Sequence, residues 1–195
     1  MILIDYMAFD QSSCQSMTFA PNSQLETIGV HAFGGCSDLI SLELPSSVKE
    51  IAQAAFYNSG LESVSFGLNS KLTKFPARLF QSCKKLTSID IPANIEEIDD
   101  EAFADSNVKS VLFAPDSKLR KIGRETFRGC AFKTIEIPSS VEQIESRAFL
   151  NCLHLTTVVI PADSKLQNVD PDAFRGCSML RAIDSSFPIL LQRRS

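Results

Sequence analysis

Cysteine thiols are the side chains of this sequence that could do chemistry, and five of the six share one local pattern. Each follows a phenylalanine by three residues, and they are Cys36, Cys83, Cys130, Cys152 and Cys177. Thiols can serve as nucleophiles, metal ligands or halves of disulfides. Ser59 and Ser106 hold the same position after two other phenylalanines. A position that takes only Cys or Ser favours a small, nearly buried side chain, so we interpret these cysteines as packing residues.

Metal binding is excluded by the expected spacing of these thiols. If the segments stack like neighbouring strands, successive thiols lie about 4.8 Å apart, so Cys130 and Cys177 are roughly 10 Å apart. Zinc needs ligands that converge at about 2.3 Å, so we predict no metal site and no cofactor. A disulfide from Cys152 to Cys130 or to Cys177 is an alternative that the strand spacing permits and the parallel Cβ vectors disfavour. Cys14 lies outside the pattern, and we expect it in the core.

A catalytic thiol would need a base, and the chain has two histidines, His31 and His154. They lie about five segments apart, roughly 24 Å at strand spacing, so they cannot share a site. Cys152 is close to His154 in sequence, but no third residue to orient the imidazole is evident. The sequence has no P-loop, dinucleotide, zinc-protease or serine-hydrolase motif. We therefore predict that the protein is not an enzyme.

These residues recur because nearly the whole chain is one repeated unit. Eight phenylalanines mark it, at intervals of 24, 23, 24, 23, 24, 22 and 25 residues: Phe9, Phe33, Phe56, Phe80, Phe103, Phe127, Phe149 and Phe174. After each comes an apolar L-x-x-L-x-L pattern, such as Leu39, Leu42 and Leu44, whose final pair alternates as a strand requires. A turn follows, short as in Pro45–Val48 or longer as in Pro115–Leu119. Length varies in two corners while the apolar ladder keeps its register, which is typical of a solenoid.

The unit L-x-x-L-x-L-P followed by S-x-x-x-I-x-x-x-A-F-x-x-C resembles the leucine-rich repeat of the BspA-like family. The resemblance covers residues 1–187 and implies a single-domain, right-handed α/β solenoid of about eight repeats of 22–25 residues. It further implies a concave parallel β-sheet, with short strands and helical turns on the other side. The apolar run Phe187–Leu191 predicts a lid, and we assign residues 188–195 to a C-terminal lid and tail.

The start of the chain predicts an open end. Met1 and Ile4 correspond to Val48 and Ile51, so the sequence begins midway through a repeat without a capping segment. The first strand, near residues 15–19, should therefore be an open edge, and open edges recruit other chains. We expect either that upstream residues precede this start or that molecules self-associate through this end.

Residues between the apolar strand positions are predicted to form columns on the exposed concave sheet. One column is almost entirely Ser and Thr, which crowding and hydrogen bonds across strands would also explain. In the next, acidic residues recur in alternate copies, roughly 10 Å apart and too far to share a calcium ion at about 2.3–2.6 Å. We interpret them as a charged stripe, for which ordinary solvated surface is the alternative. The candidate protein-binding residues are Ile40, Glu43, Glu62, Asp90, Lys109, Leu112, Lys133, Glu136, Val159 and Arg181.

Composition excludes two classes of partner. The 195 residues carry 19 Lys and Arg against 23 Asp and Glu, with no basic field to attract nucleic acid. No apolar run approaches the roughly 20 residues of a membrane span, so we predict no membrane insertion. The opening MILIDYMAFD does not fit a secretory segment, because Asp5 interrupts its apolar run.

Two functional classes then compete. The family resemblance favours a cell-surface or extracellular module that binds a host or extracellular matrix protein through its concave sheet. The absence of a secretory segment and the unpaired thiols favour an intracellular scaffold for protein–protein interaction. The sequence does not identify the ligand.

Overall fold

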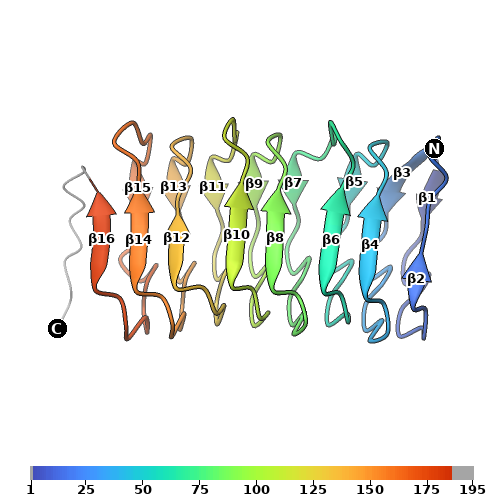
Figure 1. Cartoon of the computed structure of the whole chain (residues 1–195), viewed down its shortest axis with the longest axis horizontal. Coiled ribbons are helices and arrows are strands. Elements are labelled where there is room, and N and C mark those ends of the chain that lie inside the picture. The colour runs from blue at the N-terminus through green and yellow to red at the C-terminus, as the bar shows by residue number, and fades with distance from the viewer. Residues whose placement is uncertain (1, 186–195) are drawn as a thin grey trace.

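Each repeat crosses two layers of short parallel strands. The computed structural model describes residues 2–185, and Figure 1 shows the even-numbered strands in front of the odd-numbered ones. The front strands are β2 (Ser16–Met17), β4 (Ser41–Leu44), β6 (Ser63–Phe66), β8 (Ser88–Ile91), β10 (Ser110–Phe113), β12 (Thr134–Glu136), β14 (Thr157–Ile160) and β16 (Ala182–Ser185). The back strands are β1 (Ile2–Ile4), β3 (Leu25–Ile28), β5 (Glu50–Ile51), β7 (Lys74–Phe75), β9 (Glu97–Ile98), β11 (Lys121–Ile122), β13 (Gln143–Ile144) and β15 (Asn168–Val169). The predicted parallel solenoid of about eight repeats, with short strands on its second side, is confirmed.

The corners around the repeated phenylalanines are turns, and the predicted helical turns are wrong, because residues 2–185 contain no helix. The N–H of Phe103 donates to Thr126 O in the next repeat at 2.8 Å, whereas the N–H of Ala104 donates locally to Glu101 O at 3.0 Å. Glu101 and Asp105, on either side of Phe103, have positive φ angles of 58° and 57°. A helix needs a continuous right-handed backbone with every N–H bonded along its own axis. The N–H groups at these corners donate alternately within their own repeat and to the next repeat, and left-handed residues interrupt the right-handed backbone. The corners therefore form separate turns instead of a helix.

The phenylalanines form the centre of the core. Rings in successive repeats stack nearly parallel, with centroids 4.9 Å apart between Phe149 and Phe174 and 5.5 Å apart between Phe33 and Phe56. The rings inside the stack are fully buried, whereas Phe9 and Phe174 near its two ends are only partly buried. Leu and Ile side chains of both strand layers pack around this column. The repeat thus buries its apolar face against its neighbours, as a solenoid must.

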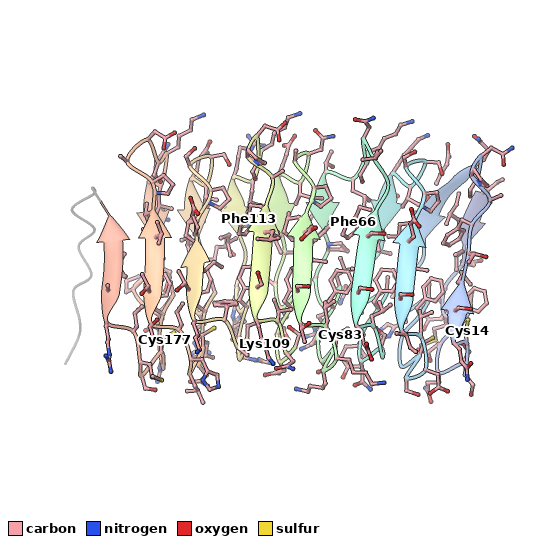
Figure 2. All side chains as sticks on the ribbon, in the orientation of Figure 1. Cys14, Phe66, Cys83, Lys109, Phe113 and Cys177 are labelled. Atoms are coloured by element: carbon pink, nitrogen blue, oxygen red, sulfur yellow. The ribbon has the colours of Figure 1, made fainter. Side chains whose placement is uncertain are left out.

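The front sheet is interrupted twice, although the phenylalanine stack is continuous. Its hydrogen-bonded groups within residues 2–185 are β2–β4–β6, β8–β10 and β12–β14–β16. Both interruptions follow a strand that ends in a partly buried aromatic ring, Phe66 or Phe113, labelled in Figure 2 at the same end of the front strands. Leu44 and Ile91 occupy the equivalent position in β4 and β8, are buried, and precede a paired strand. We attribute the openings to the larger ring.

The N-terminal end exposes apolar side chains and strand edges. Ile2 and Tyr6 are 56% and 62% exposed, and β1 and β2 each pair with a single neighbour among the described residues. The predicted open edge near residues 15–19 is therefore present at β2. The predicted lid at Phe187–Leu191 and the tail at 188–195 lie outside the described residues.

Candidate functional site

The ten predicted binding residues lie along one surface, the exposed side of the even-numbered strands, which we call the front face. Those within strands are Glu43, Asp90, Leu112, Glu136 and Val159. Those directly before a strand are Ile40, Glu62, Lys109, Lys133 and Arg181. Nine of the ten are exposed, with Leu112 at 59%, whereas Val159 is half-buried. The folded chain therefore brings the predicted residues onto a common face.

The acidic residues of the front face form a stripe across the strands. Glu43 pairs in register with Ser65, Asp90 with Leu112, and Glu136 with Val159, so acidic and neutral side chains alternate from one strand to the next. Lys109, Lys133 and Arg181 precede their strands and so lie at the other end of the face. The face is therefore acidic along one side and, in its C-terminal half, basic along the other.

The ion pairs lie away from the front face. The ten ion pairs found among the described residues join side chains of the back strands and the corners, as in Lys49–Glu26 at 2.6 Å and Lys121–Glu145 at 2.9 Å. None of the seven charged residues among the ten predicted ones takes part in them. Their charges are consequently available to a partner.

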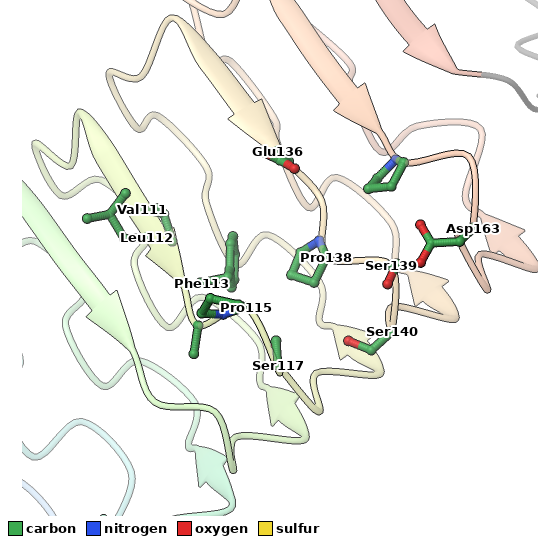
Figure 3. A pocket seen from close by; sticks show the side chains of 12 residues that line it. Val111, Leu112, Phe113, Pro115, Ser117, Glu136, Pro138, Ser139, Ser140 and Asp163 are labelled. Atoms are coloured by element: carbon green, nitrogen blue, oxygen red, sulfur yellow. The ribbon is translucent and has the colours of Figure 1, made fainter. Parts of the chain in front are cut away.

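A groove of about 390 Å³ lies at the front-sheet opening between β10 and β12, and we call it the β10–β12 groove (Figure 3). Its apolar lining includes Leu112, Phe113, Pro115, Pro138 and Pro161, and its ionisable lining is Glu136 and Asp163. Leu112 and Glu136 were predicted on the face from the sequence, whereas the groove was not predicted. The available signal was Phe113 at a strand position where most other repeats have Leu or Ile.

The cysteines form hydrogen bonds between neighbouring repeats. The thiol of each cysteine that follows a phenylalanine donates to the carbonyl of the phenylalanine one repeat earlier, with Sγ–O distances of 3.1 Å for Cys83 to Phe56 and 3.3 Å for Cys130 to Phe103. All six cysteines are free in the structure. The interpretation as packing residues thus agrees with their burial, and the hydrogen bond between repeats is an addition that spacing alone did not reveal.

The electrostatic environment of the buried thiols makes them poor nucleophiles. Burial raises the pKa of Cys83 to about 11 and that of Cys130 to about 12. The pKa of Cys152 is also raised, by the hydrogen bond with the neighbouring Cys177 thiol and by burial, and the same bond lowers the pKa of Cys177. The prediction that Cys14 lies in the core is wrong, since it is half-buried near the chain start and its thiol donates to Ser16 O at 3.2 Å.

A buried carboxylate at one corner is explained by its ion pairs. The Glu125 side chain is 10% exposed and lies 2.6 Å from the Arg128 guanidinium and 3.6 Å from that of Arg147. Burial acts to raise the pKa of Glu125, but Arg128 and Arg124 outweigh it, so the pKa lies below its ordinary value. Arg128 also contacts Asp105 in the preceding repeat. This cluster therefore joins two corners and has a structural role.

The remaining chemically capable residues do not assemble into a site within residues 2–183. The His31 ring packs edge-on against Tyr57, with centroids 5.7 Å apart. No group of three or more His, Cys, Asp or Glu side chains in this part of the chain could hold a metal ion. Among the described residues there is likewise no helix with the length and apolarity of a membrane span.

Comparison with known proteins adds to this geometry. The model of the BspA type leucine rich repeat region matches residues 3–118 and 112–189, in six copies. A search of curated protein sequences finds no match to the chain.

Several solved structures share the fold. A leucine-rich repeat protein from Bacteroides ovatus aligns at 28% identity with a TM-score of 0.79, covering 94% of this chain and 46% of the other. A leucine rich cell surface protein from Faecalibacterium prausnitzii aligns at 17% identity and a TM-score of 0.57, covering 92% and 75%. The pneumococcal vaccine antigen PcpA aligns at 21% identity and a TM-score of 0.57, covering 96% and 55%. The chain thus spans less than half the length of the Bacteroides protein.

Proposed function

Because the chain belongs to the BspA type leucine-rich repeat family, we propose that it is a non-catalytic module that binds a protein partner through its front face. The observation that carries this proposal is the distribution of charge. All ten ion pairs of the described residues lie on the back and corners, whereas the seven charged candidate residues of the front face take part in none of them. Unpaired charges arranged in separate acidic and basic rows favour recognition by electrostatic complementarity.

We further propose that the module acts at the cell surface or outside the cell and adheres to a host or extracellular matrix protein. The descriptions of two structural relatives as a leucine rich cell surface protein and a vaccine antigen support this setting. An intracellular scaffold is the second candidate, and the free cysteines favour it, because oxidising compartments tend to convert closely spaced thiols to disulfides.

Affinity capture distinguishes these candidates and tests the face. The chain is immobilised and exposed in parallel to purified extracellular matrix proteins and to cell lysate. We expect capture of a matrix protein that is lost in the triple variant Glu43→Lys, Asp90→Lys, Glu136→Lys. Arg175→Glu is the matched control, because Arg175 is exposed on a corner and outside the ion pairs. If a partner is still captured by the triple variant but is no longer captured by Arg175→Glu, the binding surface lies on the side opposite the front face.

The N-terminal end supports a proposal of self-association. Its exposed Ile2, Leu3 and Tyr6 and the unpaired edges of β1 and β2 could pair with a second copy. Sedimentation across a concentration series is expected to show reversible dimers that Tyr6→Lys weakens, whereas a monomer at every concentration would contradict the proposal.

A further inference from the structure

We propose that the β10–β12 groove receives an arginine side chain from an extended, arginine-containing segment of the partner, which runs across the front strands. This inference rests on the proposed use of the front face and adds the chemical class of the bound segment.

The shape of the groove suits a flat side chain with apolar faces. Leu112 and the partly buried Phe113 ring lie on one side of the groove and Pro138 lies on the other (Figure 3), and Pro161 also lines the groove. A guanidinium is planar, is weakly hydrated and stacks on aromatic rings, so it can lie between such walls. The volume of about 390 Å³ falls within the range typical of ligand sites and leaves room for residues that flank the arginine.

The charge of the groove selects a cation. Its ionisable lining consists of the two carboxylates Glu136 and Asp163, both exposed and both outside the ion pairs of the described residues. A guanidinium can bind carboxylates through paired hydrogen bonds, which a lysine ammonium cannot reproduce. The same carboxylates disfavour phosphate groups and therefore argue against an anionic ligand.

The spacing of the stripe defines the form of the segment. Glu43, Asp90 and Glu136 lie on β4, β8 and β12, so that one front strand separates each from the next. Each interval contains one paired step of about 4.8 Å and one opening, β6–β8 or β10–β12, where the strands are not paired, so successive acidic residues lie at least about 10 Å apart. A polyproline II segment has three residues per turn and rises about 3.1 Å per residue, which places every third side chain on one side at intervals of about 9 Å. Because an arginine side chain is long and flexible, arginines at every third position can still reach Glu136, Asp90 and Glu43 in turn.

Fluorescence anisotropy with a labelled Pro-Pro-Arg repeat peptide tests this proposal on the intact chain. We expect saturable binding, weakened about tenfold or more by Asp163→Lys, because like charges oppose each other in a recognition site. Leu112→Ser should also weaken binding without affecting folding, since Leu112 is 59% exposed. Glu50→Lys is the matched control, because Glu50 is an exposed acid on back strand β5, outside the ion pairs, and this variant should bind like the original chain.

Three results would overturn the proposal: no binding of the peptide, equal binding of a scrambled peptide of the same composition, or an equal loss with Glu50→Lys and Asp163→Lys. The outcome is separable from that of the proposed function. If a captured protein is lost in the triple variant but the peptide does not bind, the front face is the binding surface and the arginine proposal fails. If peptide binding depends on Asp163 while a captured partner binds the triple variant as well as the original chain, the proposed function fails instead.

Discussion

At the scale of single residues, the cysteines show how one position can serve packing and hydrogen bonding together. A buried thiol fills the space beside the phenylalanine stack and donates to the preceding repeat, as Cys83 does to Phe56 O at 3.1 Å. Ser59 and Ser106 occupy the same position and lie 3.4 Å and 3.5 Å from the next cysteine sulfur. The alternation of Cys and Ser in the sequence therefore reflects a need for a small hydrogen-bonding side chain.

The raised thiol pKa values predict a loss of stability in alkaline solution. Burial raises the pKa of Cys83 to about 11 and that of Cys130 to about 12 in the folded chain, whereas in the unfolded chain each thiol has its ordinary pKa of 9.0. A group with a raised folded pKa contributes stability that is complete below its unfolded pKa and is lost as pH rises. Between pH 8 and 10.5 we expect each thiol to lower the free energy of unfolding by about 2 kcal/mol.

Urea denaturation at the two pH values measures this effect. The double variant Cys83→Ser, Cys130→Ser uses residues that the repeat itself accepts at this position, and it should lose less stability on the same change of pH. An equal loss in both proteins would assign the alkaline sensitivity to other groups. Alkylation of the folded chain at neutral pH should meanwhile be confined to the half-buried Cys14 and Cys177.

At the scale of elements, the front sheet is interrupted where strands end in phenylalanine. We predict that Phe113→Ile, which gives β10 the residue type that ends β8, closes the opening between β10 and β12. Hydrogen exchange should then slow at the backbone amides at the start of β12, because a paired N–H exchanges more slowly than an exposed one. Phe66→Ile is the reciprocal control, expected to protect β8 and leave β12 unchanged. Unchanged exchange at both openings would mean that the rings do not cause them.

The sequence was enough to predict the front strands but not the turns or the groove. Alternation in L-x-x-L-x-L was enough to assign the front strands and to place Glu43 and Asp90 on their exposed side. The helical turns were wrong because they came from the family resemblance, and the alternating donors around Phe103 depend on carbonyls one repeat away. The groove escaped prediction for a similar reason, since its walls come from β10 and from turns of later repeats. Local patterns therefore predict strands, whereas contacts between repeats require the folded chain.

At the scale of the whole molecule, stability should depend on position along the stack. Phe103 is fully buried between two rings, with centroids 5.4 Å from those of both Phe80 and Phe127, whereas Phe9 is partly buried and stacks on Phe33. We expect Phe103→Ala to cost about 3–5 kcal/mol, the usual loss for removing a large aromatic ring from a packed core. Phe9→Ala should cost clearly less. Chemical denaturation checks both, and equal losses would contradict a stack with weaker ends.

The direction of the contacts between repeats also has a mechanical consequence. Stacked rings, strand pairing and thiol bonds all join one repeat to the next, so tension applied to the two ends would pass through these contacts in series. The repeats with the fewest such contacts, at the ends and beside the two openings, would yield first. Each released repeat of 22–25 residues would lengthen the chain by roughly 80 Å. Under force, this protein would behave as a tether that extends in steps, with each step set by the length of one repeat.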